Sequence, residues 1–393
     1  SMTVTYDLVV IGAGINGAGI AQAASARGWS VLVIDKGAVA NGTSSKSSKL
    51  IHGGLRYLET LQLKLVYECL RERRLLLRNA PDLVKLKPFY IPVYQHSRRS
   101  SLWIRLGLSL YALLGGLGHN TRFASIPAQQ WRKLNGLNTE DLTHVFRYYD
   151  AQTDDAALTR AVLASAQTLG AQVITNKRVT HVLGDQEFYH VLLHGERQGI
   201  RCRALVNAAG PWVNHVAACV DPAVPTLPID LVQGAHIILN MPAPEGCFYL
   251  ESEDDGRAVF VLPWKGKVMV GTTETMCGDT PEQCQPQQAE IDYLLRVYND
   301  YFPGTERNAT ANDIVEVTAG LRVLPKAKSH SLVANKLPRE TQFINAGRQP
   351  MYLAIYGGKL TSYRATAEKV ANILAGGLPK KESCAKTEEL MLV

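Results

Sequence analysis

The stretch that decides the fold is DLVVIGAGINGAGIAQAASARGWSVLVIDK, residues 7–36. Residues 7–11 are a short apolar run typical of a strand, and a glycine-rich turn follows at once. Small residues at 20–27 predict a helix, and residues 30–34 predict a second strand that ends at Asp35. This order of strand, glycine turn, helix, strand and acid is typical of a sheet that binds a dinucleotide.

Each glycine of this turn has a physical role. Gly12 allows the sharp turn out of the strand, Gly14 lets the backbone approach a pyrophosphate, and Gly17 lets the helix pack on the sheet. The free N–H groups at the start of the helix favour phosphate oxygens. Asp35 follows the glycines at the distance where a carboxylate accepts hydrogen bonds from ribose hydroxyls.

The composition is that of an ordinary folded protein. The 393 residues are 46% hydrophobic and 20% charged, which allows a large core and a division into two domains. The net charge of +7 and the pI near 8.9 suit an anionic substrate or an acidic membrane surface. Because the basic residues are dispersed and no nucleic-acid motif is visible, we expect no nucleic-acid partner.

The cysteines and the N-terminus indicate the compartment. The seven cysteines are scattered, odd in number and without a CxxC pair, so we expect reduced thiols and neither a disulfide frame nor a metal site. A redox pair of Cys277 and Cys284 is the alternative, but the polar loop around them favours bystanders. We interpret residues 1–2 as a tag remnant and find no signal peptide, so a cytoplasmic protein is expected.

A hydroxyl-rich segment follows the opening stretch. Residues 42–50 (GTSSKSSKL) have no apolar periodicity, and their hydroxyl and N–H groups could hold phosphate or flavin oxygens; a solvated serine loop is the alternative. Next, Gly53 and Gly54 allow the backbone to approach a flat ligand closely. Arg56 and Tyr57 then offer a fork of donors and a phenol.

Two helices are predicted before the middle of the chain. Residues 64–78 have a helical pattern whose arginines form a solvated face. Residues 102–118 (LWIRLGLSLYALLGGLG) are nearly all apolar and short for a membrane span. We favour a buried helix for this segment. A helix on a bilayer surface is the alternative, which Arg98 and Arg99 just before it support.

The second half of the chain repeats the opening theme. Residues 229–273 contain short β-type runs that predict a second, largely antiparallel sheet, and residues 288–301 predict a helix. Residues 351–356 form a strand that runs into two glycines and a helix to about residue 375. A flavin dinucleotide needs two helix starts, one at the pyrophosphate and one near the ring, whereas NAD alone does not. The tail after Gly377 is polar, and we expect it to be loose.

Together these motifs resemble those of the FAD-dependent glycerol-3-phosphate dehydrogenases, which belong to the wider amine-oxidase-like flavoproteins. Residues 47–59 (SSKLIHGGLRYLE) are the most specific. The motifs that carry the resemblance are residues 11–19 (IGAGINGAG), 43–59 (TSSKSSKLIHGGLRYLE), 205–212 (LVNAAGPW), 261–264 (VLPW), 270–273 (VGTT) and 357–364 (GGKLTSYR). Most members continue with a further helical domain, and its absence here leaves the oligomeric state and membrane docking open.

The resemblance implies an α/β fold, in which a Rossmann-type FAD-binding domain is joined to an antiparallel β-sheet substrate domain. The expected boundaries are residues 1–80, 148–222 and 319–378 for the FAD-binding domain, 81–147 for a substrate or cap segment, 223–318 for the antiparallel domain and 379–393 for a tail. The implied reaction oxidises sn-glycerol 3-phosphate to dihydroxyacetone phosphate, with hydride transfer from C2 to flavin N5. The electrons would pass to a quinone, to oxygen or to another acceptor, and peripheral contact with the cytoplasmic face of the inner membrane is left open.

The resemblance also implies the site residues. His236 is our choice for the general base because histidine titrates near neutral pH. Arginine forks match phosphate oxygens two at a time. The catalytic and substrate-binding set is His236, Arg56, Tyr57, Arg322, Lys359 and, in a stretch that departs from the family pattern, Arg339. The FAD-binding set is Gly12, Gly14, Ile15, Asn16, Gly17, Asp35, Lys36, Thr43, Ser44, Ser45, Ser48, Lys49, Leu50, His52, Gly53, Gly54, Val179, Ala208, Ala209, Gly210, Trp212, Gly320, Arg322, Gly358, Lys359, Leu360 and Thr361.

Two alternatives for the function stay open at this point. One is a related flavin oxidase of an amino acid or a 2-hydroxy acid, which would need a carboxylate fork in place of a phosphate cluster. The other is a flavin-binding module that has lost turnover and acts through a partner. A NAD-binding protein is disfavoured by the second glycine turn at Gly357 and Gly358.

Overall fold

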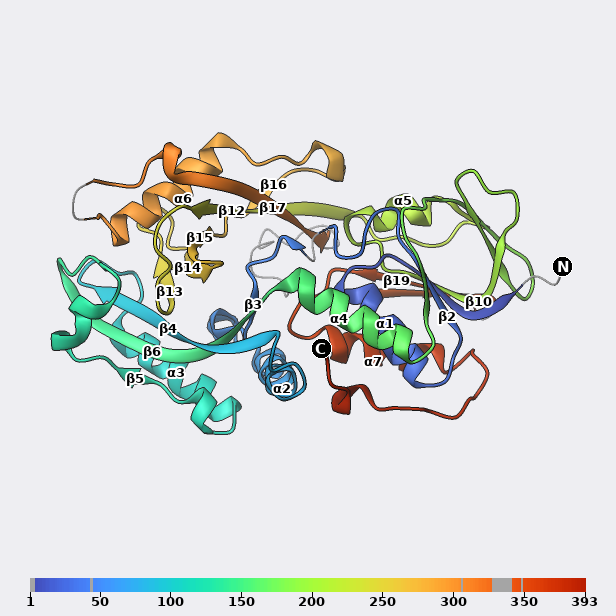
Figure 1. Ribbon diagram of the computed structural model, residues 1–393, viewed down its shortest axis with the longest axis horizontal. Coiled ribbons are helices and arrows are strands. Elements are labelled where there is room, and N and C mark those ends of the chain that lie inside the picture. Colours follow the sequence, from blue (N-terminus) through green and yellow to red (C-terminus); the bar gives the residue numbers. More distant parts are fainter. Residues whose placement is uncertain (1–3, 43–44, 305–306, 327–340, 348) are drawn as a thin grey trace.

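The opening stretch folds into β1 (Thr5–Ile11), α1 (Ile15–Ala26) and β2 (Val31–Ile34), in the predicted order. The computed structural model describes residues 4–42, 45–304, 307–326, 341–347 and 349–393 (Figure 1). α1 begins at Ile15 and not near residue 20, because the glycines beyond Ile15 pack inside the helix. A side chain at Gly17 would collide with the carbonyl oxygen of Gly12.

A first sheet is built around β1, which pairs in parallel with β2 and with β10. Its order in the described residues is β11-β8-β9-β10-β1-β2-β7, and β19 pairs with both β10 and β18. The further strands are β7 (Gln172–Ile174), β8 (Val179–Gly184), β9 (Tyr189–Leu193), β10 (Ile200–Asn207), β11 (Val220–Asp221), β18 (Gln342–Ala346) and β19 (Met351–Tyr356). Helices α1, α4 (Asp155–Thr168) and α7 (Tyr363–Leu374) pack together beside it and bury an apolar core against β1 and β2.

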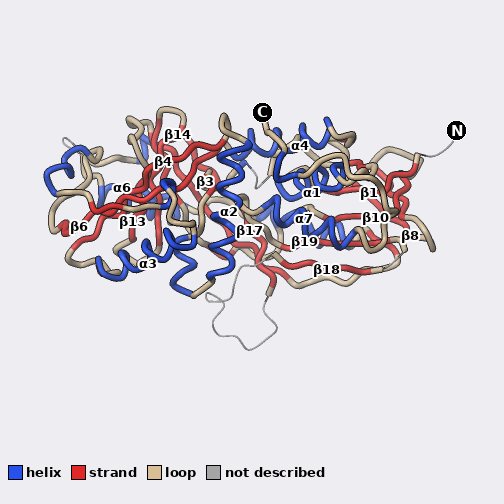
Figure 2. The backbone as a smooth tube through the Cα atoms, turned by 90° about the horizontal axis from the view of Figure 1, so that it is seen from below, coloured by secondary structure: helices blue, strands red, loops and turns tan. Residues whose placement is uncertain are grey.

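A second sheet lies beside the first along the molecule (Figure 2). Its order is β16-β12-β15-β14-β13-β4-β6-β3, with β17 on β12 and β5 on β6. Its pairs are antiparallel except for β13 with β4, as the sequence predicted. The strands are β3 (Leu50–Ile51), β4 (Val84–Tyr94), β5 (Ala124–Ser125), β6 (Leu142–Thr153), β12 (Ile229–Leu239), β13 (Cys247–Glu251), β14 (Ala258–Trp264), β15 (Lys267–Gly271), β16 (Thr275–Met276) and β17 (Ile314–Pro325).

This second sheet crosses two of the predicted domain boundaries. The boundary between residues 147 and 148 falls inside β6, and the boundary between 318 and 319 falls inside β17. The strands of the predicted cap segment, β4 and β6, therefore belong to the same sheet as β12. The resemblance treated them as separate units, but backbone pairing joins them.

The remaining helices cover the second sheet. α6 (Gln288–Tyr301) packs against β12, β14 and β15, and α2 (Leu63–Asn79) contacts both β4 and α3 (Ser101–Leu114). Short 3-10 turns complete the chain: η2 (Leu55–Thr60), η3 (His119–Thr121), η4 (Ala128–Lys133), η5 (Gly210–Trp212), η6 (Pro281–Gln283), η7 (Ala311–Asp313) and η9 (Thr387–Glu389), with a short helix α5 (Val213–Ala217).

The expectation that residues 102–118 form a buried helix is wrong. Only one side of α3 is buried, at Leu108, Tyr111 and Ala112. The other side exposes Leu102 by 75% and Leu106 by 62%. Within the described ranges, no helix has both the length and the apolar character needed to cross a membrane.

The C-terminal tail is packed against the body, which corrects the prediction of a loose segment. The indole of Trp29 donates to the carbonyl oxygen of Pro379 over 2.8 Å, and Lys381 forms an ion pair with Asp7. At the end of the chain, Leu392 is buried and its N–H donates to Asn79. The residues that make these contacts are interspersed among the polar residues on which the prediction of a loose tail was based.

The expectation of seven reduced cysteines is also wrong for one pair. Cys277 and Cys284 form a disulfide, because the polar loop between them folds back and brings their Cα atoms to 5.6 Å. The pair named as the alternative is therefore the one that is bonded, although the polar character of the loop favoured free thiols. The cysteines Cys69, Cys202, Cys219, Cys247 and Cys384 are free.

Candidate cofactor and substrate site

A cavity of about 670 Å³ opens where the two sheets meet. Its volume is in the usual range for sites that bind small molecules and cofactors. Most of the residues predicted from the sequence line it: Gly12, Gly14, Ile15, Asn16, Asp35, Lys36, Ser48, Leu50, His52, Arg56, Tyr57, Val179, Ala208, Ala209, Gly210, Trp212, His236, Gly320, Arg322, Gly358, Lys359, Leu360 and Thr361.

The two glycine turns meet in this cavity. The amide of Asn16, in the first turn of α1, donates to the carbonyl oxygen of Gly357 over 3.0 Å. Gly358 has a φ of +129°, and a Cβ there would lie 2.5 Å from the Asn16 amide nitrogen. Gly12 has a φ of +112°, and a Cβ there would collide with Ala208. Glycine is therefore required at both turns, which leaves bare backbone facing the cavity.

Asp35 links the end of β2 to the first glycine turn. Its carboxylate accepts hydrogen bonds from the N–H groups of Ala13, at 2.6 Å, and Gly37, at 2.8 Å. An ionised carboxylate has further lone pairs. Since Asp35 also lines the cavity, its position fits a ribose hydroxyl as well as the turn that it holds.

A stacked pair closes one part of the cavity wall. The ammonium of Lys36 lies 3.2 Å from the ring centre of Trp212, and the indole N–H donates to Glu282 over 2.7 Å. Burial lowers the pKa of Lys36, against the opposing charges of Glu282 and Asp35. Sequence reasoning missed Glu282, which lies in the loop that the disulfide closes.

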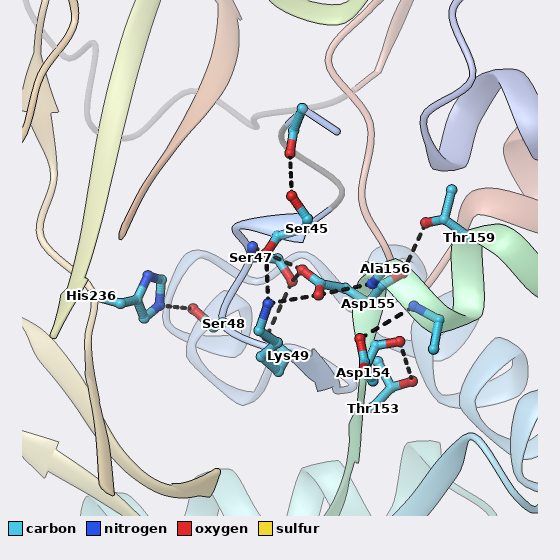
Figure 3. Close-up of polar contacts among 12 residues, drawn as sticks. Ser45, Ser47, Ser48, Lys49, Thr153, Asp154, Asp155, Ala156, Thr159 and His236 are labelled. Atoms are coloured by element: carbon cyan, nitrogen blue, oxygen red, sulfur yellow. Dashed lines mark hydrogen bonds and ion pairs between the residues drawn. The ribbon is translucent and has the colours of Figure 1, made fainter. Parts of the chain in front are cut away.

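The serine-rich segment has only part of the predicted role (Figure 3). Ser48 lines the cavity, and its Oγ lies 2.9 Å from Nε2 of His236. The side chain of Lys49 points away, to Asp155 and to the carbonyl oxygen of Ser45, each at 2.7 Å. The hydroxyl of Ser45 donates to Gly42. Lys49 and Ser45 therefore do not line the cavity, because their polar groups are satisfied within the protein.

Three further predicted glycines act behind the cavity wall. Gly17 packs beneath Gly12, and a Cβ at Gly53 would collide with Tyr111 and Leu70. Gly54 is left-handed, with a φ of +75°, and caps the turn that carries Arg56 and Tyr57. They shape the site without lining it. The predicted residues Thr43, Ser44 and Arg339 lie outside the described residues.

Cations surround the phenol of Tyr57. The ammonium of Lys359 lies 5.2 Å from its ring centre and the guanidinium of Arg56 lies 5.4 Å away. Burial alone would raise the pKa of Tyr57, but the charges of Arg56, Lys359 and Arg322 reverse the effect and lower it. Arg322 also bonds Glu274 at 3.0 Å. Three cations on one wall can bind a dianion such as a phosphate monoester.

Two histidines, the buried His236 and the half-buried His52, line the same cavity as neutral imidazoles. Burial, assisted by Lys49 and Arg322, lowers the pKa of His236 to about 4. Burial together with Arg56, Lys359 and Arg73 lowers the pKa of His52 to about 3. The expectation that His236 titrates near neutral pH is therefore wrong. A neutral imidazole still accepts a proton, and His52, predicted only as a cofactor contact, has the same capacity.

Several lining residues were missed. Lys177 and Arg178 follow β7, a parallel neighbour of β2, and so lie at the carboxyl edge of the first sheet. That edge is where α/β sheets bind ligands, so an assignment of β7 to this sheet would have found them. Lys46 and Thr272 also line the cavity. No spacing in the sequence distinguishes either from its neighbours.

The fold and the cavity define a class of protein: a dinucleotide-dependent oxidoreductase in which a mixed sheet with parallel central strands holds the cofactor and a largely antiparallel sheet faces it. The sequence pattern of the family described as FAD dependent oxidoreductase matches residues 7–371. The chain is 36% identical to the aerobic glycerol-3-phosphate dehydrogenase of Escherichia coli (strain K12) over 374 residues, which cover 93% of this chain and 72% of that protein. It is 37% identical to the glycerol-3-phosphate dehydrogenase of Pseudomonas aeruginosa over 371 residues, or 92% and 70%.

Solved structures agree. The glycerol-3-phosphate dehydrogenase from Bacillus halodurans, complexed with FAD, superposes with a TM-score of 0.73 at 27% identity, covering 99% of this chain and 68% of that one. The L-alpha-glycerophosphate oxidase from Mycoplasma pneumoniae, with FAD bound, gives 0.76 at 18% identity, covering 96% and 97%, which supports the fold. The chain therefore belongs to the FAD dependent oxidoreductases and, within them, to the family of the glycerol-3-phosphate dehydrogenases, and the predicted resemblance is confirmed.

The residues present fit FAD. The bare backbone at Gly12 and Gly358 forms a cradle that any side chain would fill. Among the described residues, Oδ1 of Asn16 and Nδ1 of His236 are buried and have no hydrogen-bond partner in the protein. Both atoms belong to residues that line the cavity. Buried polar atoms normally have a partner, so these two are available to a bound group.

Proposed function

We propose that this chain oxidises sn-glycerol 3-phosphate to dihydroxyacetone phosphate with FAD as its cofactor, and that it passes the electrons to a quinone or another acceptor. The observation that carries the proposal is the group of Arg56, Lys359 and Arg322 around Tyr57 inside the cavity. The curated relatives at 36% and 37% identity are named for this substrate. A carboxylate substrate would need one arginine fork, whereas three cations suit a phosphate dianion.

The chain's own residues supply binding and orientation. The N–H groups at the start of α1 and the Gly12 turn suit the pyrophosphate, and Asp35 suits a ribose. When bound, the flavin accepts the hydride of the substrate's second carbon. Arg56 and Arg322 would hold the phosphate by paired donors, while Tyr57 would bond a substrate oxygen. This arrangement fixes the distance between the carbon and the ring.

The base that takes the hydroxyl proton is one of the two histidines that line the cavity. His236 is held by Ser48 and has a buried Nδ1 that makes no bond to the described residues. His52 lies near two of the proposed phosphate-binding cations, because burial and then the charges of Arg56 and Lys359 lower its pKa. We expect His236→Asn to lower kcat about 100-fold or more at an unchanged flavin content. If His52→Asn alone has that effect, the assignment of base moves to His52.

One anaerobic experiment tests the proposed reaction. The purified yellow protein is mixed with glycerol 3-phosphate, and the visible absorption band of the oxidised flavin is followed by stopped flow. Bleaching by glycerol 3-phosphate, but not by glycine, proline or lactate, is the expected result. Subsequent addition of a soluble quinone or of air then identifies the acceptor. A flavin that stays oxidised with every substrate would favour a binding module without turnover.

Arg322 offers a test of the phosphate assignment. Arg322→Ala removes a charge-assisted pair of donors, so we expect KM for glycerol 3-phosphate to rise by about 10- to 100-fold. Flavin content should stay the same, because Arg322 is on β17 of the second sheet, away from the α1 turn. Arg322→Lys should recover only part of the affinity. An unchanged KM with intact flavin would remove Arg322 from the substrate site.

A surface of α2 and α3 supports peripheral contact with an anionic membrane. Leu102, Trp103 and Leu106 are exposed along one side of α3, and Leu63 and Tyr67 are exposed on the neighbouring α2. Exposed cations accompany them on the same two helices: Lys64, Arg71, Arg74 and Arg105. Apolar side chains beside basic ones are typical of helices that lie on a bilayer surface. A quinone acceptor dissolved in that bilayer would then be within reach.

A further inference from the structure

The segment that carries Ser48 is held from behind by one buried carboxylate (Figure 3). Asp155, the first residue of α4, is fully buried. Its Oδ2 accepts from both the N–H, at 3.0 Å, and the hydroxyl, at 2.7 Å, of Ser47. Its Oδ1 accepts from the ammonium of Lys49 at 2.7 Å. Asp155 thus holds the two residues that flank Ser48.

Ser48 itself faces the opposite way. Its hydroxyl lies 2.9 Å from Nε2 of His236, which belongs to β12 of the second sheet. Two residues before Ser48, the carbonyl oxygen of Lys46 lies against Gly320 of β17, where a Cβ would approach it to 2.7 Å. The segment therefore connects two parts of the fold. On one side it is bonded to Asp155 of α4, and on the other side it contacts β12 and β17 of the second sheet.

The backbone of the segment needs such a hold. Lys49 has a φ of +63°, in the left-handed region that residues other than glycine rarely adopt. Its ammonium is buried and also bonds the carbonyl oxygen of Ser45 at 2.7 Å. A strained backbone persists where surrounding contacts over-determine it. Here the contacts that do so converge on Asp155.

We propose that Asp155 is a positioning residue for the reaction: by holding Ser47 and Lys49, it fixes the Ser48 hydroxyl on Nε2 of His236 and so sets the orientation of that imidazole in the cavity. With Ser48 on Nε2, the Nδ1 atom is the ring nitrogen left for a bound group. The proposal rests on the proposed function only for the catalytic use of His236. The contact chain from Asp155 to His236 stands without it.

The comparison variant is a second buried ion pair. Arg364 bonds Glu72 through two hydrogen bonds of 2.8 and 2.9 Å and joins α7 to α2. Neither residue lines the cavity. Asp155→Asn and Glu72→Gln each remove the charge of a buried carboxylate from its cation, so both should lower stability. Only Asp155→Asn should affect His236.

A thermodynamic cycle tests whether Asp155 acts through Ser48. We expect Asp155→Asn and Ser48→Ala each to slow flavin reduction by glycerol 3-phosphate by about tenfold or more, and the double variant to be no slower than the worse single variant. Glu72→Gln should stay within about twofold of the parent, since neither Glu72 nor its partner Arg364 lines the cavity. Effects that multiply in the double variant would overturn the proposal. If Asp155→Asn fails to fold, Lys49→Met takes its place, because it leaves Asp155 three protein donors.

A readout without turnover separates this proposal from the proposed function. The ring nitrogen signals of His236 are followed by NMR in the flavin-loaded protein and are assigned from their loss in His236→Asn. We expect Asp155→Asn and Ser48→Ala to shift the Nε2 signal in the same direction, and Glu72→Gln to leave it in place. An unmoved Nε2 signal in Asp155→Asn overturns the proposal. If glycerol 3-phosphate never bleaches the parent protein, the proposed function fails, while these shifts still decide the role of Asp155.

Discussion

His236 and His52 are the two titratable bases in the cavity whose charge state burial decides. Both imidazoles are held neutral well below their ordinary range, with pKa values of about 4 and about 3. For a base that starts a reaction at neutral pH, this keeps the accepting form fully populated. Burial is the main cause of both low pKa values. Arg56, Lys359 and Arg322, which are assigned to the phosphate, add to it together with Lys49 and Arg73, so the phosphate-binding cations also help to keep the imidazoles neutral.

The same pKa shifts predict a pH dependence of stability. Above about pH 6.5 both histidines are neutral whether the chain is folded or unfolded. As the pH falls below that value, the unfolded chain binds protons first, so the free energy of unfolding decreases until the pH reaches about 4 for His236. We expect His236→Gln to reduce the slope between pH 6 and 4 by roughly one proton, about 1.4 kcal/mol per pH unit. Urea unfolding at several pH values measures it, and parallel curves for the two proteins would contradict it.

Gly358 tests whether the second glycine turn faces the cofactor. Alanine there meets both an unfavourable φ and the amide of Asn16, whereas Gly266→Ala meets only the φ of +78°, with open space around it. Both should lose about 1–2 kcal/mol of stability from the left-handed backbone. Only Gly358→Ala should also lose FAD during gel filtration, which the ratio of flavin to protein absorbance reports. Equal flavin retention in the two variants would place the cofactor away from this turn.

Among single residues, the sequence correctly places in the cavity those whose position is set by a glycine turn close to them in the chain. Gly12, Gly358, Arg56 and Tyr57 all lie next to glycine turns, and each lines the cavity. Lys49 has the same local pattern but is turned to Asp155. Its partner lies 106 positions away in the chain, so no local rule could predict the pairing.

Among the elements, α3 carries the next prediction. If its exposed leucines enter a bilayer surface, Leu102→Ser combined with Leu106→Ser should lower partitioning onto phosphatidylglycerol vesicles by about 10- to 100-fold. Flavin content and turnover with a soluble acceptor should not change, because neither leucine lines the cavity. Leu183→Ser, at an exposed leucine on β8 in the other half, is the control. Vesicle sedimentation measures binding, and equal partitioning of all three proteins would remove α3 as the contact.

Whole elements follow their periodicity closely. α6 covers residues 288–301 as predicted, and the short β-type runs after residue 229 became β12 to β15. The errors arose where the burial of a segment depends on residues far away in the chain. The apolar pattern of α3 does not determine whether other elements cover both of its sides. The polar composition of the tail does not predict that Lys381 forms an ion pair with Asp7.

On the scale of the molecule, the cavity belongs to both sheets. β1, β2, β10 and β19 bring backbone turns to it, while β12 and β17 contribute His236 and Arg322. Sequence patterns could not predict that β4 and β6 continue the sheet of β12, because parallel and antiparallel partners are chosen by packing far along the chain. The apolar core also continues from one sheet to the other, since one buried cluster joins β1 and β2 to β4 and β6, and the cavity lies where the two sheets meet.

Removal of FAD should consequently lower the stability of the residues around the cavity in both sheets. A ligand that binds only the folded chain adds about 2.7 kcal/mol at a free concentration of 100 Kd, so Tm should fall on stripping and return with added FAD in a concentration-dependent way. Hydrogen exchange locates the effect: amides of the α1 turn and of β12 should both lose protection. Amides in the middle of α6, whose Leu294 and Val297 face its own core, should change little. A loss of protection confined to the α1 side would mean that the cofactor does not span the two sheets, and the placement of His236 beside it would then fail as well.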